Sequence, residues 1–369
     1  MRITIPQPQL LKHLQIVEHA VNDRSTLPIL ANVLIETTEQ GLLLSATDLD
    51  VGIQCRFPLA QPIEKGAVAL PARKFTTIIR ELPEDLVVVE ARKNHTATIT
   101  CGASSFRVPG LPAEDFPALP PAALHEQVTI PQGALKALIT QTAHAMSMEE
   151  TRFILNGALL TLQKGELVMV ATDGRRLAVA RAPVSQTTAH QLQAVIPAKT
   201  VRELGRTLQG EDEAMDEVKI APLKDNQLTF AFGDVTIITR LIEGQFPQYD
   251  KVIPPPAKTT MTCRRQTLIN AIRRASLMTS ATSQAVVFEV GGGKLVVSKE
   301  SAELGSAREE IDAAYPGEPI TIAFNPEFWL DVLKVVEAED VVVELAGPEK
   351  PAVIRQAGFT YLVLPMKAI

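Results

Sequence analysis

Apolar residues that favour β-strands run from Leu167 to Ala171, and alternation of apolar and polar positions resumes at Leu177, after an Asp173-Gly174 pair. This pattern predicts a strand, a tight turn and a second strand. Asp-Gly between two such runs is typical of a type I′ hairpin turn, in which both central residues take φ > 0. Similar apolar runs stand at residues 43–49 and 295–300. The hydrophobic pattern therefore indicates a repeat.

Each copy of the repeat shows the same further elements in the same order. A strand leads into an amphipathic helix, the strand pair follows, a second strand leads into a second helix, and a last strand closes the copy. Prolines near the helix entrances fit this interpretation, because the first helical turn tolerates them. The predicted helices span residues 7–21, 72–82, 132–146, 198–208, 264–278 and 325–336. The predicted closing strands contain residues 106–108, 237–239 and 361–364.

The copies begin at Ile3, Val128 and Met261, so each is the size of a domain rather than of a short solenoid repeat. Pro-rich joints at residues 111–121 and 246–256 separate them. Two helices and several strands in each copy predict an α+β fold with helices packed on antiparallel sheet. We expect three repeated domains, at residues 1–125, 126–254 and 255–369.

Composition fits a globular protein of more than one domain, because the chain has 369 residues of which 46% are apolar. No apolar run reaches the roughly 20 residues of a membrane span, and the first residues lack the apolar core of a signal peptide. Three cysteines, far apart and without a CxxC pair, favour reduced thiols in the cytosol. We expect a cytoplasmic protein without a membrane partner.

The net charge of −6, taken alone, argues against a nucleic-acid partner. The predicted helices, however, contain thirteen Lys or Arg and only five Asp or Glu. If all helices face one side, that side attracts phosphate. Solvated helix faces that merely tolerate Lys and Arg are the other explanation. The sequence has no helix-turn-helix, zinc-finger or RRM pattern. Phosphate contact without base readout is therefore the nucleic-acid hypothesis.

The common catalytic and metal-binding motifs are absent from the sequence. It has no GxxxxGK[ST], GxGxxG or GxSxG motif, and its six histidines show no HExxH spacing. His13 and His19, six residues apart on one predicted helix, are expected at the surface. Asp48 and Asp173 recur at the same predicted turn, where Asp commonly bonds to its own backbone. We expect no catalytic residue, no metal and no cofactor.

Seven short motifs, in order, extend over essentially the whole chain. They are TLPIL (26–30), ATDL (46–49), PARKF (71–75), ATDG (171–174), RLAV (176–179), FPQY (246–249) and LPMK (364–367). Their combination closely resembles the bacterial β sliding clamp family, the processivity subunit of the replicative DNA polymerase. The resemblance implies a non-catalytic, head-to-tail homodimer that closes into a ring around duplex DNA. Helices would line the hole and sheets would form the outer wall, which agrees with the basic helices.

The resemblance also implies a hydrophobic pocket, between the second and third domains, that binds short linear peptides. The implied partners are double-stranded DNA without sequence preference, a second copy of the chain, the DNA polymerase catalytic subunit, the clamp loader, other polymerases, and mismatch-repair or ligase-type proteins. A bacterial, cytoplasmic and nucleoid-associated location is implied as well.

Site residues follow from matching the family's positions. The implied pocket residues are Leu155, Thr172, Gly174, Arg175, Arg176, Leu177, Pro247, Val252, Leu362, Leu364, Pro365 and Met366. The implied DNA contacts are Arg24, Arg73, Lys74, Arg80, Arg152 and Lys199. The implied dimer interface joins Phe106, Arg107 and Val108 of one subunit to Leu277, Met278, Glu300 and Glu303 of the other. From the residues alone, ordinary strand core is the favoured explanation for the four pocket leucines at positions 155, 177, 362 and 364.

The chain departs from the family pattern at four positions. Arg175 stands where many members have His, Lys251 where Arg is common, and Glu149 and Phe153 where some have Gln and Tyr. These departures affect the expected peptide preference and one local DNA contact. Two other functions stay open: a monomeric scaffold that never encloses DNA, and a metal-dependent enzyme acting on DNA through Asp48 or Asp173.

Overall fold

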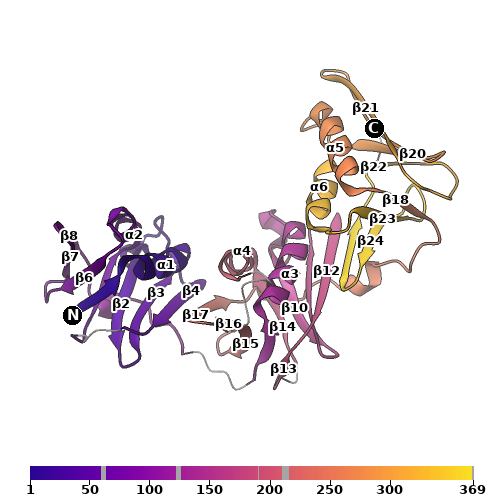
Figure 1. Ribbon diagram of the computed structural model, residues 1–369. Helices are drawn as coiled ribbons and strands as arrows, with labels where there is room; N and C mark the ends of the chain where they lie inside the picture. Colours follow the sequence, from indigo (N-terminus) through magenta and orange to yellow (C-terminus); the bar gives the residue numbers. More distant parts are fainter. Residues whose placement is uncertain (60–63, 122–125, 190, 210–215, 368–369) are drawn as a thin grey trace. The chain divides into compact units, whose positions relative to one another are not determined.

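The computed structural model describes residues 1–59, 64–121, 126–189, 191–209 and 216–367 (Figure 1). The predicted domain boundary at residue 125 falls on a residue outside this set. No α-helix among the described residues is long and apolar enough to span a membrane.

The elements form three repeats, as the sequence predicts. The first repeat contains β1 (Arg2–Pro6), α1 (Gln7–Val17), β2 (Asn32–Thr38), β3 (Gly41–Thr47), β4 (Val51–Phe57), β5 (Ala67–Pro71), α2 (Ala72–Glu81), β6 (Leu86–Ala91), β7 (Thr96–Cys101) and β8 (Ser104–Pro109). The second contains β9 (Val128–Pro131), α3 (Gln132–Thr142), β10 (Gly157–Gln163), β11 (Glu166–Thr172), β12 (Arg176–Pro183), β13 (Gln186–Thr187), β14 (Gln193–Pro197), α4 (Ala198–Thr207), β15 (Glu217–Leu223), β16 (Gln227–Phe232) and β17 (Val235–Arg240). The third contains β18 (Thr260–Arg264), α5 (Arg265–Ala275), β19 (Val286–Gly291), β20 (Lys294–Ser301), β21 (Gly305–Asp312), β22 (Ile320–Phe324), α6 (Pro326–Val335), β23 (Asp340–Leu345), β24 (Ala352–Gln356) and β25 (Phe359–Val363).

All six predicted helices are confirmed. The longer predictions at the start of each repeat include a short 3₁₀ helix that continues the α-helix. These are η1 (Glu18–Ala20), η4 (Ala143–Ala145) and η7 (Ser276–Met278).

Each repeat contributes two sets of four antiparallel strands in the same order. One set runs β1-β6-β7-β8, β9-β15-β16-β17 or β18-β23-β24-β25. The other runs β5-β2-β3-β4, β14-β10-β11-β12 or β22-β19-β20-β21. The identical order confirms the predicted repeat and the α+β fold class.

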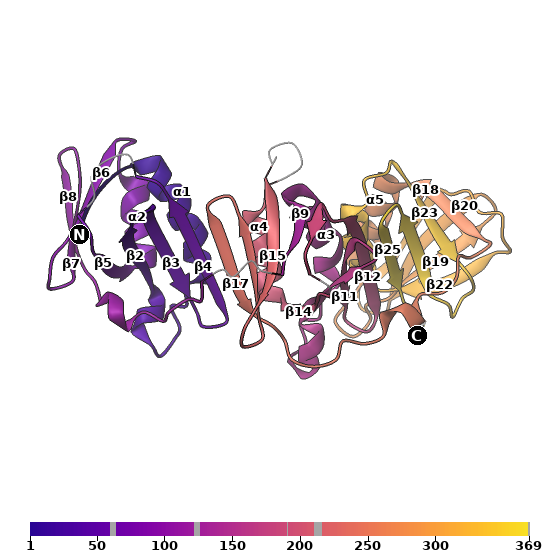
Figure 2. The same ribbon diagram turned by 90° about the horizontal axis from the view of Figure 1, so that it is seen from below.

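Neighbouring repeats are joined through their sheet edges. Strand β17 pairs with β4, with Val235 opposite Cys55, and β25 pairs with β12, with Phe359 opposite Ala180 (Figure 2). When the repeats are aligned by their hairpins, Val235 corresponds to Phe359 and Cys55 to Ala180. The two junctions therefore have the same register.

The described contacts divide the chain into two compact units. One comprises Met1–Gly133, Val184–His190 and Glu203–Leu241, and the other comprises Ala134–Pro183, Gln191–Arg202 and Ile242–Ile369. The first unit contains the β4–β17 junction and the second contains the β12–β25 junction. Sheets that cross from one repeat to the next thus hold each unit together.

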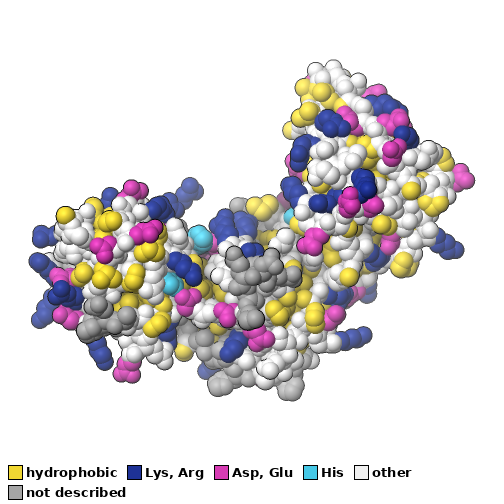
Figure 3. Space-filling model, viewed as in Figure 1, with side chains coloured by type: hydrophobic (Ala, Val, Ile, Leu, Met, Phe, Trp, Pro, Cys, Tyr) yellow, Lys and Arg dark blue, Asp and Glu magenta, His cyan; other side chains and the backbone are white. Residues whose placement is uncertain are grey.

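The helices bury aliphatic faces and expose basic ones. Helix α2 buries Phe75 and Ile79 while Arg73, Lys74 and Arg80 are exposed. Helix α5 buries its Leu and Ile residues and exposes Arg273 and Arg274 in the same way. Figure 3 shows Lys and Arg side chains on the surface near α2 and α4. The charge that the sequence assigns to the helices is therefore accessible to a polyanion.

The predicted type I′ turn at Asp173-Gly174 is wrong. Gly174 has φ = +86°, but Asp173 is not among the residues with positive φ. The loop is longer, because Thr172 pairs with Leu177, and the Asp173 carboxylate accepts hydrogen bonds from the amides of Arg175 and Arg176. A two-residue turn with positive φ at both positions occurs instead at Gly292-Gly293, between β19 and β20.

The expected surface position of His13 is also wrong. Its side chain is only 4% exposed and stacks on the Phe57 ring, with ring centroids 4.0 Å apart. Its Nδ1 contacts the Gln9 carbonyl, and its Nε2 pairs with the carboxylate of Asp234, in the turn between β16 and β17. Helix α1 of the first repeat is thereby tied to the second repeat, across the β4–β17 junction.

This pair leads to a prediction about acid stability. The hydrogen bond from His13 holds the pKa of the Asp234 carboxyl below its usual value, although burial of the carboxyl partly opposes this shift. A carboxyl whose pKa is depressed by folding stabilises the protein above its unfolded pKa, and this contribution disappears as pH falls through the folded pKa. Asp234→Asn should therefore lower the free energy of unfolding by about 1–2 kcal/mol at pH 7, after allowance for partial exposure.

Thermal unfolding between pH 7 and pH 3 provides the measurement. The deficit of Asp234→Asn relative to the unmodified chain should shrink as the pH falls below about 4. Asp312→Asn removes the carboxylate of an exposed pair with Lys294 and should change the melting temperature little. Equal melting temperatures for Asp234→Asn and the unmodified chain at pH 7 would contradict the stabilising role.

Candidate functional site

A hollow of about 210 Å³ opens in the second unit, where the β11–β12 turn, the segment after β17 and the end of β25 meet. It is lined by Leu155, Thr172, Gly174, Arg175, Arg176, Leu177, Pro247, Gln248, Tyr249, Val252, Leu362 and Leu364. Ten of the twelve pocket positions expected from the sequence are among these residues. The surface of the hollow is almost entirely apolar, which suits the apolar side chains of a ligand.

Core residues form the floor of the hollow and exposed residues form its mouth. Leu155, Leu177 and Leu362 are 7%, 3% and 3% exposed and belong to one hydrophobic cluster. Val252 and Leu364, at 58% and 40% exposed, lie at the rim. The leucines are therefore strand core and pocket lining at once, so the two explanations for them do not exclude each other.

The β11–β12 turn is held in shape by Asp173. Its Oδ1 accepts hydrogen bonds from the Arg175 and Arg176 amides at 2.9 and 3.0 Å, and Arg152 Nη1 donates to its carbonyl at 3.2 Å. A Cβ on Gly174 would meet Arg152 Nη1 at 2.7 Å, so glycine lets that guanidinium cover the turn. Asp48 caps the corresponding turn of the first repeat through the Asp50 and Val51 amides. Among the described residues, no cluster of three or more His, Cys, Asp or Glu could hold a metal ion.

Arg176 anchors the hollow to the third repeat. Its side chain donates to Asp173 Oδ2 at 3.0 Å and to Asp331 Oδ2, on α6, at 2.9 Å. The guanidinium carbon lies 4.3 Å from the centre of the Phe328 ring. This side chain is only 10% exposed. A nearly buried cation is thus paired on both sides of the β12–β25 junction, as a buried charge requires.

The groups around Arg176 have pKa values that suit this pairing. Burial raises the pKa of Asp331, but hydrogen bonds from Arg176 and Lys334 outweigh it and hold that pKa below its usual value. Burial, and then the nearby Arg176 charge, lower the pKa of His144 to about 4. Asp331 is therefore ionised and His144 neutral at pH 7, which leaves the Arg176 charge balanced by carboxylates.

Glu149 connects two exposed cations at the rim. It lies 3.7 Å from both Arg152 and Arg175, and all three side chains are about half exposed or more. Two of the departures from the family pattern, Glu149 and Arg175, are thus in contact with each other. Such exposed pairs are weak, so the rim can rearrange at low cost.

Two of the expected pocket residues lie outside this hollow, and two of its lining residues are not among those expected. Pro365 and Met366 do not line this hollow. The Met366 amide donates to the Ala323 carbonyl at 2.7 Å, and its side chain lines a different hollow. Gln248 and Tyr249 line the pocket but were not expected there, although the FPQY motif that contains them was recognised.

The expected DNA-contact residues lie in both units. Arg24, Lys74 and Arg80 are exposed in the first unit, where Arg73 forms an ion pair with Asp23. In the second unit, Arg152 is exposed and Lys199 is half-buried near the start of α4. These residues thus have accessible cationic groups, apart from the partly covered Lys199.

The expected dimer-interface residues lie on or near two edge strands. Phe106, Arg107 and Val108 are on β8, the last strand of its sheet, with Phe106 39% exposed and Val108 buried. Leu277, 69% exposed, is in η7, which contacts the edge strand β21. Met278 is half-buried, and Glu300 and Glu303 are exposed near the end of β20.

Three family models match consecutive parts of the chain. They describe the N-terminal, central and C-terminal domains of the DNA polymerase III beta subunit, and they match residues 1–120, 129–248 and 250–367. Beta sliding clamps of Proteus mirabilis and Escherichia coli K12 are each 34% identical over 371 residues, covering both chains completely.

Solved structures agree with the sequence comparisons. The DNA polymerase III subunit beta of Pseudomonas aeruginosa has a TM-score of 0.93 at 32% identity, and the match covers 100% of both chains. A sliding clamp from the same organism bound to griselimycin gives the same values. With the three domain models together matching nearly the whole chain, it belongs to the DNA polymerase III beta subunit family, the beta sliding clamps, which give the replicative polymerase processivity and have no catalytic activity of their own.

Proposed function

We propose that two copies of this chain close head to tail into a ring around duplex DNA. In this proposal, domains at residues 1–125, 126–254 and 255–369 form each half of the ring. The apolar hollow binds linear peptides of the polymerase catalytic subunit, the clamp loader, other polymerases and repair proteins. The protein works in the bacterial cytoplasm, at the nucleoid. Three features support this: the sheet edges β8 and β21, which have no outer partner among the described residues, the exposed basic helices and the hollow itself.

The edge strands are the observation on which the ring depends. Strands β4, β12 and β21 are equivalent in the three repeats, and so are strands β8, β17 and β25. At each junction a strand of the first group pairs with a strand of the second group from the next repeat. Two of the three possible pairings, β4 with β17 and β12 with β25, are made within the chain. Strand β21 and strand β8 have no partner on their outer sides among the described residues. A second copy supplies both missing partners, and a head-to-tail contact of this kind closes into a ring when the rotation permits.

The repeat also predicts the register of the pairing between subunits. Both internal junctions have equivalent residues opposite each other. The third repeat is aligned on the first through the equivalent hairpin pairs Thr38–Gly41 and Gly291–Lys294. Carrying the junction register to β8 and β21 on this alignment places Ser105 opposite Arg308 and Phe106 opposite Ala307. The exposed Leu277 in η7 lies beside β21, which gives the apolar Phe106 side chain a neighbour to pack against.

The register is tested by engineered disulfides. With Ser105→Cys and Arg308→Cys in one chain, mild oxidation should produce a covalent dimer of about 80 kDa, because paired strands bring Cα atoms to about 4.5–5.5 Å. The native cysteines at positions 55, 101 and 263 are buried and should not interfere. Non-reducing gel electrophoresis measures the product.

An out-of-register pair provides the control. Ser105→Cys with Asp312→Cys moves one thiol four residues along β21, about 13 Å away, and should give little cross-linking. Equal cross-linking of both pairs, or none of the first pair in a protein that sediments as a dimer, would contradict the proposed register.

Retention on DNA tests the ring itself. Labelled protein loaded onto nicked circular DNA by a bacterial clamp loader and ATP should stay with the circle in gel filtration and leave once the circle is cut. Phosphate contacts alone are weak and salt-dependent, so only enclosure predicts this difference. Oxidised Ser105→Cys, Arg308→Cys rings should fail to load and should load again after reduction. Equal retention on linear DNA would instead favour the scaffold or enzyme hypotheses.

The peptide pocket is tested at its exposed rim. Val252→Asp places a charge at the mouth of the apolar hollow without disturbing the core, because Val252 is 58% exposed. Burying that carboxylate beside an apolar ligand is unfavourable, so affinity for the polymerase catalytic subunit should fall at least tenfold, about 1.4 kcal/mol. Surface plasmon resonance measures the affinity.

The matched control is Val342→Asp, which introduces the same charge at a residue that is 44% exposed on β23 and does not line the hollow. Polymerase affinity should be unchanged in this variant. Loss of binding in both variants, or in neither, would be incompatible with the pocket assignment.

A further inference from the structure

One wall of the apolar hollow comes from the chain that links the second and third repeats. We call residues 246–257 the rim segment. It contains the short 3₁₀ helix η6 (Tyr249–Val252), and the prolines at positions 247, 254, 255 and 256 have no N–H to donate. The position of this wall therefore depends on what holds the two ends of the segment. Its residues in the lining of the hollow are Pro247, Gln248, Tyr249 and Val252.

The first end of the rim segment is fixed in the core. Phe246 and Tyr249 are each 5% exposed and belong to the hydrophobic cluster that includes Leu177. The Tyr249 hydroxyl also accepts a hydrogen bond from Gln163 Nε2 at 3.2 Å. Val252, at the mouth of the hollow, comes after these two aromatic anchors and is 58% exposed.

The second end is held by an ion pair of the third repeat. Arg355, on β24, donates from Nη2 to the Pro254 carbonyl at 2.6 Å and from Nε to Glu344 Oε1 at 3.0 Å. Glu344, on β23, accepts with Oε2 from the Ala257 amide at 3.1 Å. The two side chains are only 26% and 12% exposed. We call them the tether pair, because together they hold the backbone of the rim segment at two places.

The tether pair lies on the same face of the sheet as the floor of the hollow. Register partners form one row across β12, β25, β24 and β23, consisting of Leu177, Leu362, Val353 and Glu344. Residues directly opposite each other share a face of the sheet, and so do residues two apart on a strand, which places Arg355 on this face as well. The rim segment therefore crosses the sheet from the floor cluster to the tether pair.

The sheet itself does not require this ion pair. Aligning the repeats by the strand before the first helix and by the strand pairings matches Glu344 and Arg355 with Ala221 and Ala231 of the second repeat. The same sheet thus forms with two alanines at these positions. A partly buried ion pair is in general weak evidence for stability, because its charges must lose water. Its hydrogen bonds to the rim segment give the tether pair a distinct purpose.

We propose that Glu344 and Arg355 are positioning residues for peptide binding in the apolar hollow. This inference rests on the proposed peptide-binding function. Neither residue lines the hollow, so both act through the rim segment, by keeping Val252 where a bound peptide needs it. Without the tether pair the rim segment samples more conformations. The apparent affinity then falls in proportion to the fraction of molecules whose rim is in the binding conformation.

The test uses a double variant of the full chain, Glu344→Ala with Arg355→Ala. It removes both charges together, so neither is left unpaired, and it gives the third repeat the residues of the second. Affinity for the polymerase catalytic subunit, measured by surface plasmon resonance, should fall about fivefold or more, because binding must now order the rim segment.

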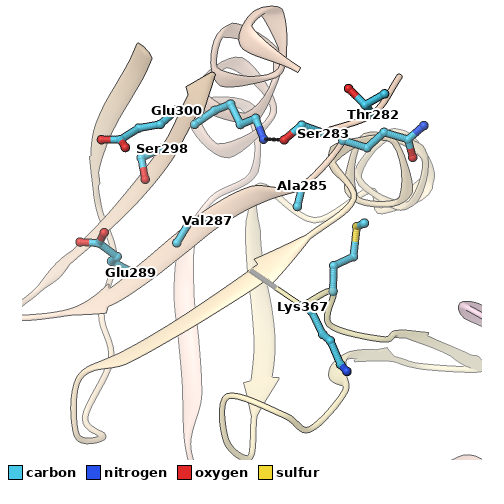
Figure 4. A pocket seen from close by; sticks show the side chains of 11 residues that line it. Thr282, Ser283, Ala285, Val287, Glu289, Ser298, Glu300 and Lys367 are labelled. Atoms are coloured by element: carbon cyan, nitrogen blue, oxygen red, sulfur yellow. Dashed lines mark hydrogen bonds between the residues drawn. The ribbon is translucent and has the colours of Figure 1, made fainter. Parts of the chain in front are cut away.

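The matched control is Arg264→Ala with Asp340→Ala. These residues are register partners on β18 and β23 and form an exposed ion pair, and neither contacts the rim segment through a described hydrogen bond or ion pair. Affinity should be unchanged in this variant. The other hollow of the third repeat, lined by Val287 and Ser298 among others (Figure 4), contains no residue of the rim segment or the tether pair. A change of affinity in the test variant therefore reports on the apolar hollow.

Hydrogen exchange measured by mass spectrometry separates positioning from a general structural role. In the unmodified chain the Lys251 amide donates to the Gln248 carbonyl at 3.3 Å. Fragments that cover the rim segment should exchange faster in the double-alanine variant, while β12, β25 and the melting temperature change little. Faster exchange throughout the second unit with a lower melting temperature would show that the pair only stabilises the fold, and would overturn the inference.

Val252→Ala shows whether the tether pair acts through the rim. In the double-alanine background this substitution should weaken polymerase binding less than it does in the unmodified chain, because a displaced rim has already lost part of the Val252 contact. Fully additive effects on the binding free energy would contradict action through the rim segment.

Failure of this inference and failure of the proposed function give different results. If Val252→Asp weakens polymerase binding and the double-alanine variant does not, the pocket assignment stands and the positioning role is overturned. If Val252→Asp binds as tightly as the unmodified chain, or if the unmodified chain does not bind, the proposed pocket function fails and the positioning role fails with it.

Discussion

An exposed sheet edge presents unpaired backbone N–H and C=O groups, which another strand can bind. In this chain that property organises the molecule. Two edges are paired between consecutive repeats with one register, and each pairing lies within one compact unit. The pocket depends on the second pairing, because Leu177 and Leu362 in its floor are register partners across the junction. A shift of one residue would turn one of them away from the hollow.

The first junction has the same backbone frame but no such pocket among the described hollows. Gly52 stands where the second junction has Leu177, and a Cβ on Gly52 would meet the Leu119 side chain at 2.5 Å. Leu119 therefore fills the space by the β4–β17 junction. Leu49, at the position of Gly174, adds a side chain where the pocket has none. A few side chains on identical frames thus decide which junction can receive a ligand.

The repeats, the helices and most pocket residues could be predicted because they depend on local hydrophobic period and on matching motifs. The turn at Asp173 could not, because its side chain caps two backbone amides and thereby favours a longer loop than the Asp-Gly pair suggests. His13 is buried only through its contact with Asp234, 221 positions away in the sequence. Lys299 on β20 is only 7% exposed, and its Nζ donates to Ser283 Oγ at 2.6 Å, a contact that the local hydrophobic period does not reveal.

The third junction, between subunits, follows from the same comparison. In the proposed register, Glu300 takes the place of Thr172 and Arg107 the place of Leu362. A threonine and a leucine of the peptide pocket are thus replaced, in that register, by two opposite charges, one from each subunit. Charges in these positions favour the correct partner strand, because the two opposite charges form an ion pair when the strands pair in this register. They disfavour an apolar peptide, because its binding would remove water from a charge without supplying a charged partner. In the proposed assembly the same kind of backbone junction thus forms a filled core, a peptide pocket or a subunit interface, and the difference lies in the few side chains that face it.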